Sequence, residues 1–241
     1  GAENVGHRAA RRTLDRRGAS KAKTGNFPVI YDRRVAASLV GSVAGAINGA
    51  SVARGTSFLK DRLGEKIAAD GLNFIDDPLR SRGMGSRPFD AEGCPVQTRK
   101  MIEDGMLNGW FLDLASAAKL GLTSMGNAKR SLGSAPNPGS SNFYLENGEI
   151  DLDDLIADIE DGFFVTELIG SSVDMITGDY SRGAGGFWIS NGKIAQPISE
   201  ATIAGNLKDM LLAVTRANDI DMRDSIASPS LRVDGMTVAG S

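Results

Sequence analysis

The sequence predicts an α+β fold made mostly of antiparallel β-sheet, barrel-like or sandwich-like, with several short helices packed against it. Thirty of the 241 residues are glycine and few are aromatic, which indicates many turns and close backbone contacts rather than a helical bundle. The pairs Asp104-Gly105, Asn147-Gly148 and Asn191-Gly192 predict hairpin turns. Helical patterns are short and do not alternate regularly with strands, so a parallel βαβ sheet is not expected.

The chain begins with a basic segment. Residues 1–23 carry seven lysines and arginines against Glu3 and Asp15, a net charge of +5 in a chain whose overall charge is −3. Residues 3–17 predict an arginine-rich helix that ends at Gly18, and residues 20–25 predict a linker. Such a segment can bind nucleic acid, but a solvated helix face is the more common role of this pattern.

The next segment predicts a strand followed by a helix. Residues 26–31 (NFPVIY) predict the strand, and Asp32 is suited to cap the helix. The apolar residues of the helix fall on one face: Val35, Leu39, Val40, Val43 and Ile47. Residues 35–53 carry no charge, but their alanine, glycine, serine and asparagine content favours a buried helix over a membrane span.

Three glycines recur every four residues along this helix, at Gly41, Gly45 and Gly49. Each costs about 1 kcal/mol relative to alanine inside a helix. The spacing therefore predicts that another backbone or a ligand comes close to this face, and close packing is the simpler explanation.

Beyond residue 71 the pattern becomes rich in strands. Residues 72–76 predict one strand, and residues 96–113 predict two strands around Asp104-Gly105. Three more helices are predicted, each with a suitable capping residue, at residues 113–120, 152–160 and 207–216. The glycine-rich stretch 178–186 predicts a tight turn or bulge before a strand at 187–189. An anion-binding loop is less favoured, because the stretch matches neither a P-loop nor a GxGxxG motif.

Composition excludes most histidine and cysteine chemistry. The chain has one histidine, His7 in the basic segment, and one cysteine, Cys94. A histidine–cysteine zinc site, a histidine-activated nucleophile and an intramolecular disulfide are therefore not expected. Carboxylates could do acid–base chemistry or hold magnesium, although their spacing assigns no role; those considered are Asp76, Asp77, Asp90, Glu92, Asp174 and Asp179. Residues 1–30 lack the apolar core of a signal peptide, so the expected compartment is the cytoplasm.

Five unusual stretches occur in order along the chain. They are SRPFDAEGCPVQ (86–97), TSMGNAKR (123–130), ELIGSSVDMITGDYSRGAGGFWISNGKI (167–194), PISEATIAGNLKDML (197–211) and SPSLRVDGMTVAG (228–240). Together they resemble the C-terminal domain of the TldD/PmbA family, also called the modulator of DNA gyrase family, in its PmbA (TldE) branch. The resemblance implies a domain at residues 24–241. It also implies that residues 1–23 are the end of an N-terminal domain that this chain lacks, since family members are about twice as long.

The resemblance implies a cytosolic metallopeptidase that works as a heterodimer on peptides, both in peptide maturation and in degradation. The TldD branch carries an HExxxH motif on a helix and a cysteine near the C-terminus. Aligned on that motif, this chain has Gly41 and Ala46 in place of the histidines and Ser42 in place of the glutamate. The cysteine segment would fall near residues 224–228, where no cysteine occurs. The resemblance therefore implies no catalytic or metal-binding residue in this chain, and zinc in a TldD-type partner.

Three functions remain open from the sequence. The favoured one is a non-catalytic subunit that pairs with a TldD-type subunit, or with itself when alone, and contacts peptide substrates. The first alternative is a self-sufficient peptidase with a carboxylate-based or intersubunit metal site. The second is a DNA- or gyrase-associated module that acts through the basic segment. Neither a membrane nor a nucleic acid is the expected partner.

Overall fold

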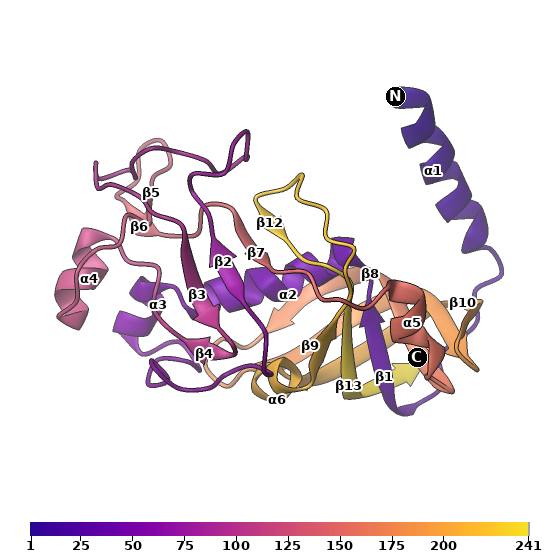
Figure 1. Ribbon diagram of the computed structural model, residues 1–241. Helices are drawn as coiled ribbons and strands as arrows, with labels where there is room; N and C mark the ends of the chain where they lie inside the picture. Colours follow the sequence, from indigo (N-terminus) through magenta and orange to yellow (C-terminus); the bar gives the residue numbers. More distant parts are fainter. Residues whose placement is uncertain (241) are drawn as a thin grey trace.

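Five strands close into a barrel (Figure 1). The computed structural model describes residues 1–240, apart from the side chain of Ser171, so Ser241 at the end of the expected domain lies outside the described residues. The barrel strands follow the order β1 (Gly25–Tyr31), β8 (Asp161–Val173), β9 (Asp179–Ser190), β10 (Lys193–Asn206) and β13 (Leu231–Gly240). Strand β13 returns to pair with β1, and β11 (Val214–Arg216) adds to its end. All barrel pairings are antiparallel except β1 with β8, which confirms the predicted barrel-like alternative.

A second, five-stranded sheet lies beside the barrel. Its order is β12 (Ile226–Ala227), β7 (Phe143–Leu145), β2 (Phe74–Asp76), β3 (Arg99–Glu103) and β4 (Met106–Leu107). The predicted turn at Asp104-Gly105 joins β3 to β4, with φ of +49° and +77° at its two residues. A small hairpin, β5 (Ala128–Lys129) with β6 (Asn137–Pro138), stands apart from both sheets (Figure 1).

Helix α2 (Arg33–Ala46) packs between the barrel and the second sheet (Figure 1). It begins directly after β1, and the Asp32 carboxylate accepts a hydrogen bond from the Arg34 amide at 2.9 Å, as predicted. Leu39, Val40, Val43 and Ile47 are buried in the main core, as expected for the apolar face. The other helices are short or peripheral: α1 (Ala2–Asp15), α3 (Gly49–Arg54), α4 (Leu114–Leu120), α5 (Leu152–Ala157) and α6 (Leu207–Leu212).

The basic segment forms the predicted helix, and α1 projects away from the rest of the molecule (Figure 1). None of its residues is buried. The segment is tied to the barrel behind the helix: Arg16 pairs with Glu167, the Ser20 amide donates to the Pro197 carbonyl at 2.9 Å, and the Lys23 ammonium lies 2.6 Å from the Asp161 carboxylate.

The uncharged run at residues 35–53 differs from the predicted single helix. The run breaks after Ala46, and α3 starts with Asn48 as its cap, whose side chain accepts hydrogen bonds from the amides of Ala50 and Ser51. No helix among residues 1–240 is long and apolar enough to cross a membrane. Of the three glycines, only Gly49 meets a backbone, since a Cβ there would lie 2.5 Å from the Phe111 carbonyl oxygen. A Cβ on Gly41 would have only the Ile226 Cδ1 atom within 4 Å, at 3.9 Å.

Three local expectations were wrong, each because tertiary pairing overrode the pattern. Asn147-Gly148 forms no hairpin: the Gly148 amide donates to the Ala217 carbonyl at 2.8 Å, and β7 pairs with β2 and β12 instead. The glycine-rich stretch 178–186 is mostly strand β9, where Gly186 leaves room for the backbone of Phe164. The helix predicted at 207–216 ends at Leu212, and its last residues pair with β13 as β11. The turn at Asn191-Gly192 and the helix capped by Asp113 and Gly121 are confirmed.

Asp76 is a buried carboxylate at the end of β2, only 2% exposed. It accepts hydrogen bonds from the Ser141 amide at 2.6 Å, the Ser141 hydroxyl at 2.9 Å and the Asn127 side-chain amide at 3.2 Å. Burial raises the pKa of Asp76 to about 6, although the Ser141 hydrogen bonds and the charges of Arg87 and Lys129 act in the opposite direction. The group therefore links three segments at an electrostatic cost near neutral pH.

Alanine substitutions in the glycine row should separate a packed position from an open one. Gly49→Ala forces a Cβ against the Phe111 carbonyl and the Leu112 side chain, and we expect it to lower the free energy of unfolding by about 1–3 kcal/mol. Gly41→Ala has room for its Cβ and gains helix propensity of up to about 1 kcal/mol. Urea unfolding of both variants measures the difference, and equal destabilisation would contradict the assignment of close packing to Gly49 alone.

The raised pKa of Asp76 predicts a pH-dependent loss of stability. The folded-state pKa of about 6 exceeds the unfolded value, so the folded state binds the extra proton between about pH 4 and pH 6. The free energy of unfolding should therefore fall as pH rises through this window, by about 3 kcal/mol from this group. Urea unfolding at pH 4.5 and 7.5 should show a flatter profile for Asp76→Asn than for the wild type. The exposed charge-matched control Asp153→Asn should keep the wild-type profile.

Candidate functional site on helix α2

The three motif positions lie in the last two turns of α2, but they do not share one environment. Gly41 and Ser42 are partly exposed, whereas Ala46 is fully buried in the main core. The Ala46 carbonyl accepts a hydrogen bond of 2.6 Å from the Ser57 hydroxyl, which ties the helix end to the following loop. The structure thus brings two of the three positions to the surface and leaves the third inside.

Gly41, Ser42 and Gly45 line an open groove of about 530 Å³, here called the α2 groove. Its remaining lining comes from α2 itself, α3, β6, β8, β9 and neighbouring loops: Ser38, Asn48, Ala50, Ser51, Arg54, Asn137, Val173, Met175 and Arg182. An adjoining hollow of about 730 Å³ shares Ser51, Val173 and Met175 with the groove. The two spaces therefore run side by side over the α2–α3 junction and the β8–β9 hairpin.

The residues at the motif positions do not fit a zinc ion. Gly41 has no side chain, and the Ser42 hydroxyl donates to the Ser38 carbonyl of the preceding turn at 3.0 Å. Ile226, from the segment expected to match the cysteine-bearing loop, does reach α2, but it presents an aliphatic group to Gly41. Among residues 1–240 no three histidine, cysteine, aspartate or glutamate side chains gather in a group that could hold a metal ion. The fold brings the expected segments together without a donor set for zinc.

Charge in the α2 groove is positive. Arg54 and Arg182 line it, and no carboxylate is found among its described lining residues. The Arg54 side chain donates a long hydrogen bond of 3.4 Å to the Ser51 hydroxyl, and the buried Arg182 Nε finds no hydrogen-bond partner within the described part of the chain. The adjoining hollow instead carries Asp174 and Asp179. The groove is thus basic, and the adjoining hollow is acidic.

Two tyrosines, Tyr31 and Tyr180, lie deeper, and Tyr180 lines the hollow. Tyr31 and Tyr180 are almost fully buried, and burial raises the pKa of both hydroxyls, with the Arg182 charge acting in the opposite direction. The Tyr31 hydroxyl donates to the Met236 sulfur at 3.3 Å, and it also interacts with the neighbouring Tyr180 hydroxyl. Sequence reasoning missed Arg182 and Tyr180, because it treated residues 178–186 as a turn; the strand periodicity of that stretch was the available signal.

The carboxylates considered from the sequence are scattered and hold local structure. Asp90 accepts three backbone hydrogen bonds of 2.9 Å, from Glu92, Cys94 and Ala128. The Asp77 carboxylate accepts from the Thr98 hydroxyl, Glu92 from the Leu114 amide, Asp174 from the amides of Ile176 and Thr177, and Asp179 from Thr177 and Asn206. His7 stays on the exposed α1, and Cys94 is partly exposed in a turn. None of these residues lines the α2 groove, although Asp174 and Asp179 border the hollow beside it.

The chain matches one family model, the PmbA/TldA metallopeptidase C-terminal domain, over residues 24–240. It is 44% identical to metalloprotease PmbA of Escherichia coli O157:H7, over 99% of this chain and 51% of that protein. It is 28% identical to the metalloprotease TldD homolog of Buchnera aphidicola, over 92% and 50% of the two chains. The chain therefore spans about half the length of the curated relatives it matches, and is more similar to this PmbA than to this TldD homolog.

Solved structures agree with this assignment. A Bacteroides thetaiotaomicron protein described as a candidate modulator of DNA gyrase superposes with a TM-score of 0.89 at 34% identity, over 98% of this chain and 52% of that one. TldE from Thermococcus kodakarensis superposes with a TM-score of 0.88 at 26% identity, over 99% and 55%. With the family match over nearly the whole chain, these similarities lead to one conclusion: the chain belongs to the PmbA/TldD metallopeptidase family, on its PmbA side.

Proposed function

We propose that this chain is the C-terminal domain of a subunit that supports peptide hydrolysis without holding the catalytic metal. The observation that carries the proposal is the α2 groove. It lies where the resemblance puts the metal motif, and its residues Gly41 and Ser42 offer no ligand that suits zinc. In this proposal a TldD-type subunit supplies zinc and the general base, and the two subunits meet in a cytoplasmic heterodimer. TldD homologs and a TldE occur among the relatives, which supports such a pairing.

The chemistry of the groove suits an extended peptide. The Ser51 hydroxyl can donate to a peptide carbonyl, and the Ser38 hydroxyl, which donates to the Val35 carbonyl, can still accept from a peptide amide. Gly41 and Gly45 leave room above α2 for the peptide. The arginines of the groove and the aspartates of the adjoining hollow favour one direction of a chain that spans both spaces. We infer that this subunit binds and orients peptide beside the chemistry of its partner.

The segment before the barrel has a separate role in this proposal. Helix α1 buries none of its residues, and the family match begins at residue 24. We propose that the domain starts at about this residue and that residues 1–23 connect it to the remainder of a longer polypeptide.

Mixing experiments test the proposal. The full-length protein is combined with its TldD-type subunit, and cleavage of an unfolded peptide is followed by mass spectrometry. We expect cleavage to fall at least about tenfold when this protein is left out, which corresponds to about 1.4 kcal/mol in the barrier. Ser42→Trp should fill the α2 groove and slow cleavage by a similar factor, while complex formation in size-exclusion chromatography stays intact.

A matched control separates groove filling from a general effect of a large side chain. Ala118 lies exposed on α4, outside the α2 groove and the adjoining hollow, so Ala118→Trp should cleave at the wild-type rate. Unchanged cleavage without this protein, or equal rates for the two tryptophan variants, would count against the proposal.

Metal analysis gives an independent test. The purified protein should hold far less than one zinc per chain after dialysis against zinc-containing buffer, because the motif positions supply no zinc donor set. A chelator should leave its unfolding midpoint unchanged. One tightly held zinc per chain, together with chelator-sensitive cleavage by the protein alone, would instead identify a self-sufficient peptidase.

A further inference from the structure

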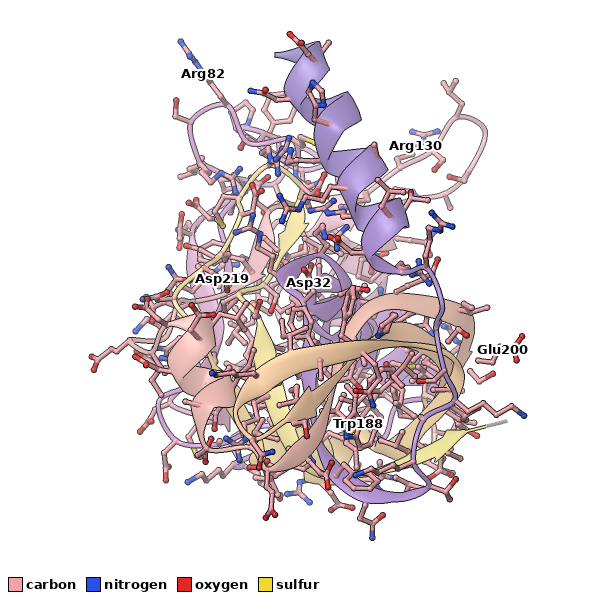
Figure 2. All side chains as sticks on the ribbon, turned by 90° about the vertical axis from the view of Figure 1, so that its right-hand side faces the viewer. Asp32, Arg82, Arg130, Trp188, Glu200 and Asp219 are labelled. Atoms are coloured by element: carbon pink, nitrogen blue, oxygen red, sulfur yellow. The ribbon has the colours of Figure 1, made fainter. Side chains whose placement is uncertain are left out.

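A second polar pocket lies outside the α2 groove. It has a volume of about 510 Å³ and lies between residues 87–91 and the β5–β6 hairpin. Three cationic residues line it: Arg87, Lys129 and Arg130. They come from two of the unusual stretches, SRPFDAEGCPVQ and TSMGNAKR, which the proposed function leaves unexplained. Figure 2 shows Arg130 on the outlying hairpin, well away from Trp188 in the barrel.

The only carboxylate that lines this pocket, among the described residues, is already satisfied. Asp90 accepts one hydrogen bond each from the amides of Glu92 and Cys94 at one oxygen and one from the Ala128 amide at the other. These three backbone bonds fix the turn that shapes one wall of the pocket. Asp90 is therefore no hydrogen-bonded counterion of Arg87 or Lys129, and the lining keeps an excess of positive charge.

Arg87 gives the strongest indication that this pocket binds a ligand. Its Nε and Nη2 atoms are buried and have no hydrogen-bond partner in the part of the chain that the structure describes. An unpaired buried N–H on a charged group costs more than a neutral one, because water is lost and nothing replaces it. A guanidinium presents its donors as a planar fork that matches the two oxygens of a carboxylate or a phosphate.

Asp76 does not supply the missing partner. Its charge acts on Arg87 and Lys129, but its oxygens receive the hydrogen bonds of Ser141 and Asn127 described above. Loss of hydration and the neighbouring Arg87 charge lower the pKa of Lys129, and Asp76 only opposes this effect. Two cations that disfavour each other in one pocket are both relieved by an added anion.

The remaining lining can complete such a site. Ser131, Ser134 and Asn137 provide hydroxyl and amide groups around the cations. The Arg130 Nε atom donates to the Ser134 carbonyl at 3.0 Å, and the Ser134 hydroxyl donates to the Ser131 carbonyl at 3.0 Å. These bonds hold the hairpin turn that brings Arg130 to the pocket.

We propose that the pocket formed by Arg87, Lys129 and Arg130 binds an oxyanion, either the carboxylate of a peptide or inorganic phosphate. This site does not depend on the proposed function of the α2 groove. Asn137 borders both spaces, so a peptide in the α2 groove could also reach the pocket.

Calorimetric titration at constant ionic strength tests the proposal. Inorganic phosphate, acetyl-trialanine with a free C-terminal carboxylate, and the same peptide as its amide are titrated into the protein, with chloride as the balancing ion. We expect saturable binding of phosphate or of the carboxylate peptide, and none of the amide. Phosphate alone would identify a phosphate site, and preference for the carboxylate peptide over its amide would identify a peptide carboxylate site.

Variants decide whether binding occurs in this pocket. Arg87→Gln and Lys129→Gln should each raise the Kd at least about tenfold, and Arg87→Lys should weaken binding less than Arg87→Gln because it keeps the charge. Lys119→Gln, which removes an exposed positive charge on α4, should bind as the wild type does. Lys129 is exposed on the hairpin, so its variant gives the answer even if Arg87→Gln fails to fold. Absence of saturable binding, or binding unchanged in Lys129→Gln, would overturn the proposal.

Discussion

Closure of the barrel by β1 against β13 is the constraint on which the rest of the structure depends. It joins residues 25–31 to residues 231–240, so the barrel exists only when both ends of the domain are in place. A closed barrel leaves no free strand edges, and its tilt and register are linked. Because α2 starts at Arg33, directly after Tyr31 at the end of β1, closure also fixes the position of α2 and of its groove.

At the positions that the resemblance assigns to a metal motif, α2 carries Gly41, Ser42 and Ala46. Ile226 still approaches Gly41, so the two segments that the resemblance assigns to metal binding remain neighbours. Their side chains now offer an aliphatic contact and an open floor. Polar groups surround these positions, with Arg182 and Arg54 in the groove and two aspartates in the adjoining hollow. The proposed function assigns this arrangement to the binding and orientation of a peptide chain.

Local signals predicted well where neighbours in the sequence are also partners in space. Asp113 begins α4 and Gly121 ends it, because a capping carboxylate and a left-handed glycine each act within one turn. Asn191-Gly192 forms its hairpin because β9 and β10 pair with each other. Asn147-Gly148 carries the same signal and fails, because β7 finds its partners in β2 and β12. An Asn-Gly pair permits a hairpin, but the hairpin forms only where the two flanking strands pair with each other.

By itself the sequence determined the α+β class, the capped helix after β1, the family and the absence of histidine or cysteine at the motif positions. Only the tertiary structure decided that Gly49 is closely packed while Gly41 lies open, although both belong to one periodic row. It also decided that Arg182 lines a groove and that two buried guanidinium nitrogens of Arg87 have no hydrogen-bond partner among residues 1–240. The physical reason is that burial and pairing depend on segments far apart in the chain, whereas capping, turn geometry and side-chain identity are local properties.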